Sequence, residues 1–555
     1  MEELENRKKV IEKLFPGQLP TPVEIEGKYP PRELKEGAMV TRIAPSPTGF
    51  MHIGVLYAAL ISEKLAHQTD GIFYLRIEDT DKKREVEGAS GLITKSLEHY
   101  GIKTDEGETV SGQEVGKYGP YKQSERADIY QTFVKSLMEK GMAYACFCSN
   151  EELEEMRVVQ EAQGVRPGYY KQWAKWRDKT NSDVLQTLEE GKKCVIRFRS
   201  NGDFDNKIVV EDVLLGERDL SENDQDIVIM KSDGLPTYHM AHIIDDHLMG
   251  TTHVIRGNEW LSSLPLHLQL FNAVGWQPPK YGHVAPIQKM EGSSKRKLSK
   301  RKDPEAGVNH YDELGYPEEA VIEYLLNLAN SNFEDWRKTN PGKNNSEFVF
   351  SLEKLSSSNG PLFDPNKLND ISKETIARYS SEEVYKKILI WANKYDSDLA
   401  KMMETESEYA IKILGIERDG EVKVRKDVGK WSDVRKEIEC FFDAHFSISK
   451  DNILNLLADV DSVDIKTLVE SFVESYDEKD SKEKWFDKIK AISLSNGYAE
   501  SSKEFKKNPG KFKGNVADVA KVFRVLLTGK TQTPDLYSIM HVMGKERVLK
   551  RLSII

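Results

Sequence analysis

The chain has 555 residues, a formal net charge of -11 and a hydrophobic content of 39%. This length exceeds what one hydrophobic core usually serves, so several domains are expected, and the composition excludes a disordered or fibrous chain. No run reaches the roughly 18 apolar residues of a membrane span, and four cysteines are too few for a disulfide framework, which fits a reducing compartment. The acidic balance does not exclude a nucleic-acid partner, because phosphate binding depends on local charge.

The N-terminal segment alternates charged and apolar residues. It predicts a short amphipathic helix over residues 1–14 and contains no apolar core of a signal peptide. A cytoplasmic location is therefore expected, and no membrane partner.

An α/β unit follows from residue 39. Residues 39–43 (MVTRI) predict a buried strand, residues 53–66 a helix and residues 72–77 a second strand. A turn rich in Pro and Gly joins the first strand to the helix. A strand–helix–strand crossover of this length predicts a βαβ unit, and hence a parallel sheet.

Residues 121–220 interrupt this pattern with a predicted helix over 149–163 and a strand over 195–199. Strand-like segments return at 227–230 and 253–255, so the sheet is expected to resume after the insertion.

A helix is predicted over residues 259–274, with Asn258 as its N-cap. From residue 303 onward the hydrophobic period is almost entirely helical.

The first motif that carries chemistry, residues 41–54, reads T-R-I-A-P-S-P-T-G-F-M-H-I-G. It places small residues, a hydroxyl group and His52 between a strand and a helix N-terminus, at the sheet edge where α/β folds bind ligands. Helix N-termini attract phosphate, and Gly54 permits a close backbone approach. A Pro-rich loop with a surface histidine is the alternative interpretation of this motif alone.

The second motif, residues 297–301, reads K-L-S-K-R and lies in a basic stretch. Two lysines on a mobile loop, Lys297 and Lys300, suit a pyrophosphate leaving group, whose negative charge grows during attack on the α-phosphate. A solvated charged loop explains the same residues.

Together the two motifs resemble the two signature sequences of class I aminoacyl-tRNA synthetases, and the longer form of the first resembles the glutamyl enzymes. The similarity continues in order through L-R-I-E-D-T-D (75–81), P-Y-K-Q-S-E-R (120–126), P-T-Y-H (236–239), D-D-H-L-M-G (245–250) and I-R-G-N-E-W (255–260). Near the end of the chain, F-R-V-L-L-T-G-K (523–530) and G-K-E-R (544–547) resemble the helical anticodon-binding region of bacterial-type glutamyl-tRNA synthetases. The resemblance runs from about residue 38 to the C-terminus.

The resemblance implies an α/β fold: a Rossmann-like parallel-sheet catalytic domain with an α/β insertion, then an all-α anticodon-binding region. The expected segments are an N-terminal extension without an assignable role (1–37), the first catalytic half (38–120), an acceptor-stem-binding insertion (121–220), the second catalytic half with the KLSKR loop (221–302), a helical stem-contact domain (303–385) and the anticodon-binding domain (386–555).

The resemblance also implies a glutamate pocket. Arg42 and Arg256 are expected around the amino acid, where a guanidinium can pair both oxygens of the side-chain carboxylate and so distinguish Glu from Gln. Glu78 is expected to hold the substrate ammonium group. The other residues implied for this pocket are Ala44, Ser46, Tyr238 and His242.

An ATP site is implied beside the glutamate pocket. Its residues are His52, Gly54, Trp260, Ile287, Lys297, Ser299 and Lys300. The catalytic roles fall on His52, Gly54, Lys297 and Lys300 among them.

The sequence departs from the family pattern in three respects. Val55 replaces the second histidine of the first signature. His242 stands where many bacterial relatives carry Asn, and its protonation would make affinity for the amino acid depend on pH. Cys146 and Cys148 resemble the start of a zinc site, but the later Tyr-x3-Cys is missing, so zinc is not expected and the two thiols are interpreted as packing residues of the insertion.

The implied reaction has two steps. The α-carboxylate of L-glutamate attacks the α-phosphate of ATP, with Mg²⁺ offsetting phosphate charge, and a ribose hydroxyl of the terminal adenosine of tRNA-Glu then attacks the adenylate. Enzymes of this branch generally need tRNA for the first step. A non-discriminating enzyme that also uses tRNA-Gln and an inactive tRNA-binding paralogue are the alternatives, and a monomer is expected.

A basic and aromatic stretch near the C-terminus suits splayed anticodon bases and their phosphates. A solvated helix face is the competing interpretation. The stretch comprises Lys503, Phe505, Lys506, Lys507, Lys511, Phe512 and Lys513.

Overall fold

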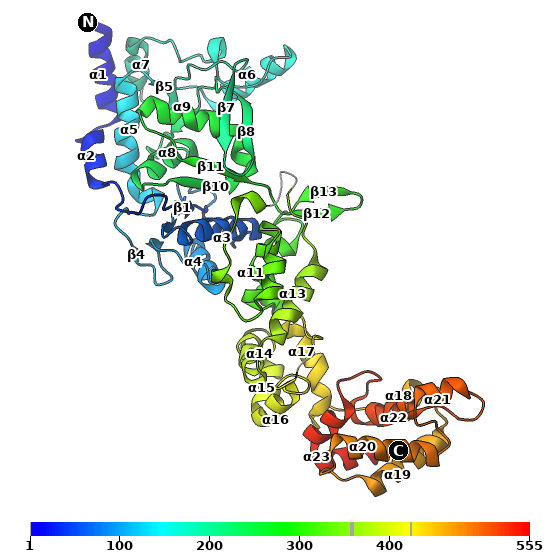
Figure 1. Ribbon diagram of the computed structural model, residues 1–555. Helices are drawn as coiled ribbons and strands as arrows, with labels where there is room; N and C mark the ends of the chain where they lie inside the picture. The colour runs from blue at the N-terminus through cyan, green and yellow to red at the C-terminus, as the bar shows by residue number, and fades with distance from the viewer. Residues whose placement is uncertain (1, 356–359, 422–423, 555) are drawn as a thin grey trace. The chain divides into compact units, whose positions relative to one another are not determined.

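The computed structural model describes residues 2–355, 360–421 and 424–554 (Figure 1). The chain divides into two compact units. The first comprises Met1–His310 and Ile322–Asp364, and the second comprises Tyr311–Val321 and Pro365–Ile555. The finer division into six segments stays a prediction.

The predicted βαβ unit is confirmed. Strand β1 (Val40–Ile43) leads into helix α3 (Ile53–His67) and strand β2 (Ile72–Leu75), and β1 pairs with β2 in parallel. Helix α3 is buried on most of its surface, as its nearly uninterrupted apolar sequence requires. Gly71 ends the crossover where a Cβ would lie 1.9 Å from the carbonyl oxygen of Met39, so any other residue would push the two strands apart.

The parallel sheet resumes at strand β10, as expected. Strand β10 (His253–Gly257) pairs in parallel with β11 (Lys280–Val284), and the amide of Thr252 donates to the carbonyl of Val40 on β1 (3.0 Å). The hairpin of β7 (Lys207–Asp212) and β8 (Gly216–Ser221) joins the same four-stranded sheet through β11. The end of the insertion is therefore continuous with the catalytic sheet.

The insertion has its own antiparallel sheet, in the order β5–β6–β9. It consists of β5 (Ala143–Cys146), β6 (Val195–Phe198) and β9 (Val228–Met230). The expectation that residues 227–230 return to the catalytic sheet is wrong, because β9 pairs with β6 instead. The predicted helix forms as α6 (Asn150–Ala162), with Ser149 in a capping box.

The helix predicted over residues 259–274 forms only in its second half. A 3₁₀ helix spans Asn258–Ser263, and α9 spans Leu264–Val274, so Asn258 is not the N-cap. Pro265 lies in the first turn of α9 and has no amide hydrogen to donate. An α-helix that began at residue 259 would therefore lack a backbone hydrogen bond at Pro265.

The remaining helices of the first unit surround these sheets. Helix α1 (Glu2–Leu14) is the predicted amphipathic helix; Met1 lies outside the described residues. The others are α2 (Pro22–Lys28), α4 (Ala89–His99), α5 (Ala127–Glu139), α7 (Asn181–Glu189), α8 (Tyr238–Leu248) and α12 (Phe333–Thr339). Two further helices, α10 (Asn309–Leu314) and α11 (Glu318–Ala329), each have residues in both units. The first unit also contains two short antiparallel hairpins. One pairs β3 (Gly107–Glu108) with β4 (Glu114–Val115), and the other pairs β12 (Gln288–Glu291) with β13 (Ser294–Lys297).

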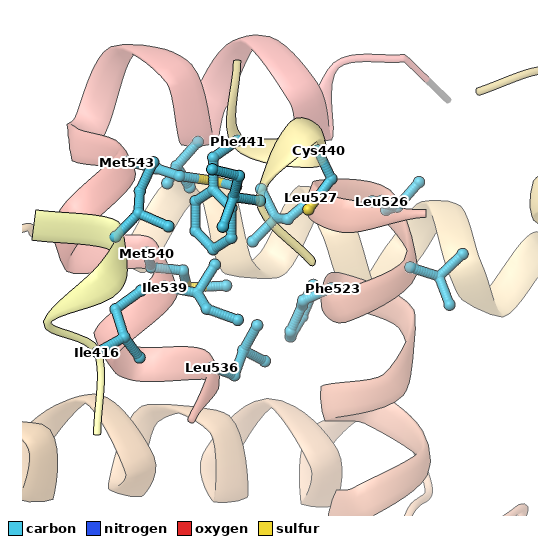
Figure 2. Close-up of a cluster of buried hydrophobic side chains, with 14 of the residues drawn as sticks. Ile416, Cys440, Phe441, Phe523, Leu526, Leu527, Leu536, Ile539, Met540 and Met543 are labelled. Atoms are coloured by element: carbon cyan, nitrogen blue, oxygen red, sulfur yellow. The ribbon is translucent and has the colours of Figure 1, made fainter. Parts of the chain in front are cut away.

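The second unit is helical, as the period of the sequence predicts. Its helices include α13 (Pro365–Ala377), α14 (Ser381–Tyr395), α15 (Ser397–Thr405), α16 (Ser407–Leu414), α17 (Trp431–Ile438), α18 (Lys450–Leu456), α19 (Ser462–Ser475), α20 (Lys482–Ser495), α21 (Ser502–Lys507), α22 (Val516–Thr528) and α23 (Leu536–Leu552). Phe523, Leu527 and Met540 meet in the cluster of buried side chains between α22 and α23 (Figure 2). Within the described residues, no helix has the length and apolar character that crossing a membrane requires.

Candidate active site

The two signatures meet at the N-terminus of α3. His52 is the N-cap of this helix, and its Nε2 lies 3.3 Å from the carbonyl oxygen of Leu298 in the second signature. Lys300 Nζ donates to the carbonyl oxygen of Phe50 in the first. The split site that the two motifs predict is therefore one continuous surface.

The contacts of His52 define its protonation state. The amide of Gly54 donates to Nδ1 (2.8 Å), so Nε2 carries the hydrogen that faces the Leu298 carbonyl. Burial lowers the pKa of His52, which keeps the ring neutral. A Cβ at Gly54 would lie 3.1 Å from Nδ1, so the glycine also makes room for the ring.

The N-terminus of α3 is less open than the sequence alone suggests. The amide of Gly54 is used by the ring of His52, and the amide of Val55 donates to the His52 carbonyl (2.8 Å). The helix end therefore caps itself, since the amides of Gly54 and Val55 both donate to His52.

A cavity of about 350 Å³ opens beside these residues. Most of the expected site residues line it: Arg42, Ala44, Ser46, His52, Gly54, Glu78, Tyr238, Arg256, Trp260, Ile287 and Lys297. Three expected residues that the structure also describes lie outside this lining, namely His242, Ser299 and Lys300. Segments of β1, α3, α8, β10 and β13 thus supply one pocket.

Arg256 is fixed at the end of β10 by several partners. Its Nε donates to His283 Nε2 (3.0 Å), its Nη1 lies 3.1 Å from His267 Nδ1, and its Nη2 donates to the carbonyl of Trp260 (3.2 Å). Tyr238 lies in front of it, with its ring 4.3 Å from that of Trp260. These contacts hold a guanidinium in the pocket wall, where it offers charge to an anionic ligand.

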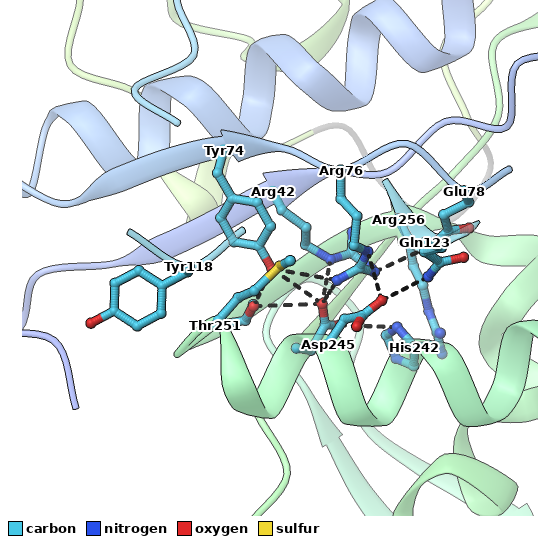
Figure 3. A network of polar contacts seen from close by, with 12 residues as sticks. Arg42, Tyr74, Arg76, Glu78, Tyr118, Gln123, His242, Asp245, Thr251 and Arg256 are labelled. Carbon is cyan, nitrogen blue, oxygen red and sulfur yellow. Dashed lines mark hydrogen bonds and ion pairs between the residues drawn. The ribbon is translucent and has the colours of Figure 1, made fainter. Parts of the chain in front are cut away.

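A buried ionic network lies behind the pocket. Two of its central residues, Arg76 and Asp246, have no role in the sequence-based assignment. Arg76, which is fully buried on the segment after β2, donates through Nη1 to Asp246 Oδ1 (2.6 Å) and through Nη2 to Glu78 Oε1 (3.1 Å) (Figure 3). Arg42 Nε lies 3.4 Å from the same oxygen of Asp246. The sequence contains one signal for this network, an arginine inside the apolar run I-F-Y-L-R-I (72–77). A charge buried in such a strand needs a partner of opposite charge.

Glu78 depends on this network for its charge. Burial raises its pKa, while Arg76 and Arg42 oppose that effect. Its carboxylate faces the cavity and is held from behind by Arg76. A carboxylate in this position suits a cationic group of a ligand.

His242 lies one layer behind the pocket. Its ring stacks on Tyr238 (5.5 Å between centroids), and its two nitrogens lie 3.0 Å from Asp246 Oδ2 and 3.0 Å from the Tyr281 hydroxyl. Burial lowers the pKa of His242 to about 3. The ring is neutral at ordinary pH, so the expected pH dependence is displaced to strong acid.

We expect His242→Asn to retain adenylate formation, because an amide can still donate to Asp246 while Tyr238 keeps its other contacts. The KM for glutamate should change by less than about tenfold, the effect of one hydrogen bond. Steady-state ATP–pyrophosphate exchange measures this, and complete loss of exchange contradicts it. The wild-type KM should also show no histidine titration between about pH 6 and 9.

Lys297 ends β13 and projects to the cavity. Its Nζ lies 3.0 Å from Glu259 Oε1, and both side chains are about half exposed. An exposed pair of this kind is weak and exchanges easily with solvent or a phosphate. Lys297 is therefore available to a charged ligand without a large cost.

Cys146 and Cys148 pack within the insertion, as expected. Cys146 is buried, and the sulfur atoms of Cys146 and Cys148 lie 3.4 and 3.5 Å from the hydroxyl of Tyr169. They belong to a small cluster with Tyr144 and Met156. The absence of zinc stays a prediction.

Comparison with known proteins identifies the family. Residues 38–368 match the model of the catalytic domain of class I tRNA synthetases (E and Q), and residues 423–555 match that of an anticodon binding domain. The chain belongs to the class I tRNA synthetases of the glutamate and glutamine group. The resemblance drawn from the motifs is thereby confirmed.

Relatives of this synthetase extend over nearly its full length. It is 49% identical to the glutamate–tRNA ligase of Clostridium perfringens over 97% of this chain and 98% of that protein. It is 48% identical to that of Acetivibrio thermocellus over 94% of this chain and 95% of that protein. A crystal structure of a glutamate tRNA ligase from Elizabethkingia meningosepticum in complex with its amino acid aligns with a TM-score of 0.72 and 30% identity, covering 93% and 98% of the two chains.

The residues of this synthetase fit magnesium that arrives with ATP. Mg²⁺ keeps several waters and is usually held by substrate phosphates with one or two carboxylates. Among the described residues, no group of three or more His, Cys, Asp or Glu side chains converges as a metal cage. Glu259, the carboxylate beside Lys297 in the cavity wall, would be available to support such an ion.

Proposed function

We propose that this synthetase joins L-glutamate to tRNA-Glu in two steps, first forming glutamyl-adenylate from ATP and then transferring the glutamyl group to the terminal adenosine. The observation that supports this is one cavity lined by residues of both signatures together with Arg42, Arg256 and Glu78. The near full-length similarity to glutamate–tRNA ligases supports the choice of amino acid.

The amino acid would lie between opposite charges. Arg42 and Arg256 face its carboxylates, and Glu78 faces its ammonium group. Glutamine lacks the second negative charge, so a wall with two guanidinium groups discriminates against it. Tyr238 and Ser46 complete the pocket with hydroxyl groups.

The adenylate step needs positioning and charge stabilisation rather than a protein nucleophile. Trp260 and Ile287 provide apolar surface for the base, and His52 with Gly54 lies at the phosphate end. Lys297 and Lys300 would stabilise the charge that builds on the departing pyrophosphate. Bound Mg²⁺ would neutralise part of the phosphate charge.

The second unit would bind the anticodon end of the tRNA. The basic and aromatic stretch lies on α21 and the loop after it, where all five of its lysines are exposed. Lys513 is already engaged in an ion pair, because its Nζ lies 2.6 Å from Asp464 Oδ1. Lys511 lies over the ring of Phe512 (5.3 Å), an arrangement that suits a stacked base.

The deciding experiment measures tRNA-dependent ATP–pyrophosphate exchange with each of the twenty amino acids, followed by charging of purified tRNA-Glu and tRNA-Gln. We expect exchange with glutamate only and charging of tRNA-Glu. Charging of both tRNAs would identify a non-discriminating enzyme. An absence of exchange with glutamate would leave the inactive tRNA-binding paralogue. The monomeric state and the cytoplasmic location stay predictions.

A further inference from the structure

Residues 2–37 form an N-terminal strap that contacts several parts of the first unit. Val10, Ile11 and Phe15 are buried in the core that α1 shares with α5 and α7, and the three helices lie side by side in Figure 1. Glu26 Oε1 accepts a hydrogen bond from Trp276 Nε1 (2.8 Å). The strap is therefore integrated into the fold rather than appended to it.

The second half of the strap crosses the edge of the catalytic domain. Arg32 donates to both oxygens of Glu106 (2.9 and 2.7 Å) and, through Nε, to the carbonyl of Met249 (2.8 Å). Its guanidinium also lies 3.9 Å from the ring centre of Tyr118. Arg32 thus joins the C-terminal end of α8, the helix that carries Asp245 and Asp246 of the buried ionic network, to Glu106 directly before β3.

Tyr29 connects the strap to that network directly. Its hydroxyl donates to the carbonyl of Gly119 (3.0 Å) and accepts from Arg126 Nη1 (3.3 Å). Arg126 is 1% exposed, and its Nε donates to Asp245 Oδ1 (2.8 Å). A buried guanidinium held this way has little freedom to reorient.

From Asp245 the connection reaches the cavity. Asp245 Oδ2 accepts from Gln123 (2.8 Å) and lies 3.6 Å from Arg76 Nε (Figure 3). Arg76 in turn donates to Glu78, the carboxylate in the cavity wall. Because these charges are buried, a displacement of one changes the position that the next must adopt.

We propose that Tyr29 is a positioning residue for the amino-acid pocket: through Arg126, Asp245 and Arg76 it holds Glu78 in the orientation that receives the substrate ammonium group. This gives the N-terminal strap a role in glutamate binding. The inference rests on the proposed role of Glu78.

Tyr29→Phe tests this with the least disturbance, since it removes one hydroxyl and keeps the ring. We expect the KM for glutamate to rise about three- to tenfold, as for the loss of one hydrogen bond, with the KM for ATP unchanged. Tyr118→Phe is the matched control, because its hydroxyl also anchors the strap, on the carbonyl of Pro30 (2.9 Å). A purely structural role would lower the Tm of both variants alike and leave the two KM values for glutamate equal.

The variant Glu78→Gln separates this inference from the proposed function. If Glu78→Gln leaves the KM for glutamate unchanged, the proposed pocket itself is wrong. If Glu78→Gln raises the KM and Tyr29→Phe does not, the pocket stands and the strap has no positioning role. If the pocket and the positioning role are both correct, Tyr29→Phe should not raise the KM for glutamate further in the Glu78→Gln background, because the connection ends at the Glu78 carboxylate.

Discussion

Replacing Lys297 by alanine should lower kcat for tRNA-dependent ATP–pyrophosphate exchange by about 100- to 1,000-fold, the usual effect of removing one group that stabilises transition-state charge. Lys297 projects into the cavity from the end of β13, and its Nζ forms an exchangeable pair with Glu259. Negative charge grows on pyrophosphate as it leaves, so the lysine is needed more in the transition state than in the ground state. The KM for glutamate should change little.

Lys295→Ala is the matched control for this experiment. Lys295 lies two residues earlier on the same strand and is exposed. It should keep wild-type exchange if the effect belongs to Lys297 itself. An equal loss in both variants would mean that the hairpin acts through its general positive charge, and a loss below about tenfold for Lys297→Ala would remove the role assigned to it.

Asp246→Asn should lower the free energy of unfolding by about 3 to 5 kcal/mol, because it removes the buried carboxylate that two buried guanidinium groups share. Asp246 is fully buried between Arg76 (2.6 Å) and Arg42 (3.4 Å). Glutamate binding should be lost as well, since Arg76 also holds Glu78. Urea unfolding and the KM for glutamate measure the two effects.

The pH dependence of this loss follows from the pKa of Asp246. Burial alone would raise that pKa, but Arg76 and Arg42 outweigh it and hold it well below its ordinary range. The stabilisation is therefore complete above the unfolded-state pKa of about 3.9 and is lost as the pH falls below it. The difference in unfolding free energy between wild type and Asp246→Asn should be constant near neutrality and shrink in acid.

Asp70→Asn is the control for that comparison. Asp70 pairs with Lys35 (2.6 Å), but the two side chains are 70% and 78% exposed. Solvent screens such a pair, so its removal should leave the unfolding free energy nearly unchanged. Asp70 has a positive φ of 55°, which asparagine also tolerates, so the backbone introduces no second effect. An equal loss in both variants would show that burial of Asp246 does not matter.

Local sequence was sufficient to predict the elements that have a clear hydrophobic period and that pack against neighbours close by in the chain. The βαβ unit of β1, α3 and β2 was predictable because a buried crossover needs apolar strands and an apolar helix at short spacing. The ordered motifs identified the family and most of the cavity lining. Residues 41–54, 75–81 and 255–260 could do so because these motifs begin on β1, β2 and β10 and run past the carboxyl ends of the strands, where α/β folds bind ligands.

Strand pairing could not be predicted in the same way. Strand β9 has a sequence equally suited to either sheet, and only its packing against β6 decides which one it joins. The start of α9 was misplaced because Asn258 is a good cap in isolation, while the 3₁₀ turn before Pro265 takes its place. Such choices depend on contacts between residues far apart in sequence.

The amino-acid sequence by itself determined the family, the two signatures and many of the residues that line the cavity. The tertiary structure decided the position of His242 behind Tyr238, the ionic network of Arg76 and Asp246, and the connection of Tyr29 to that network. The physical reason is burial: the charge and pKa of a side chain depend on which distant groups surround it away from water, and local spacing does not specify those groups.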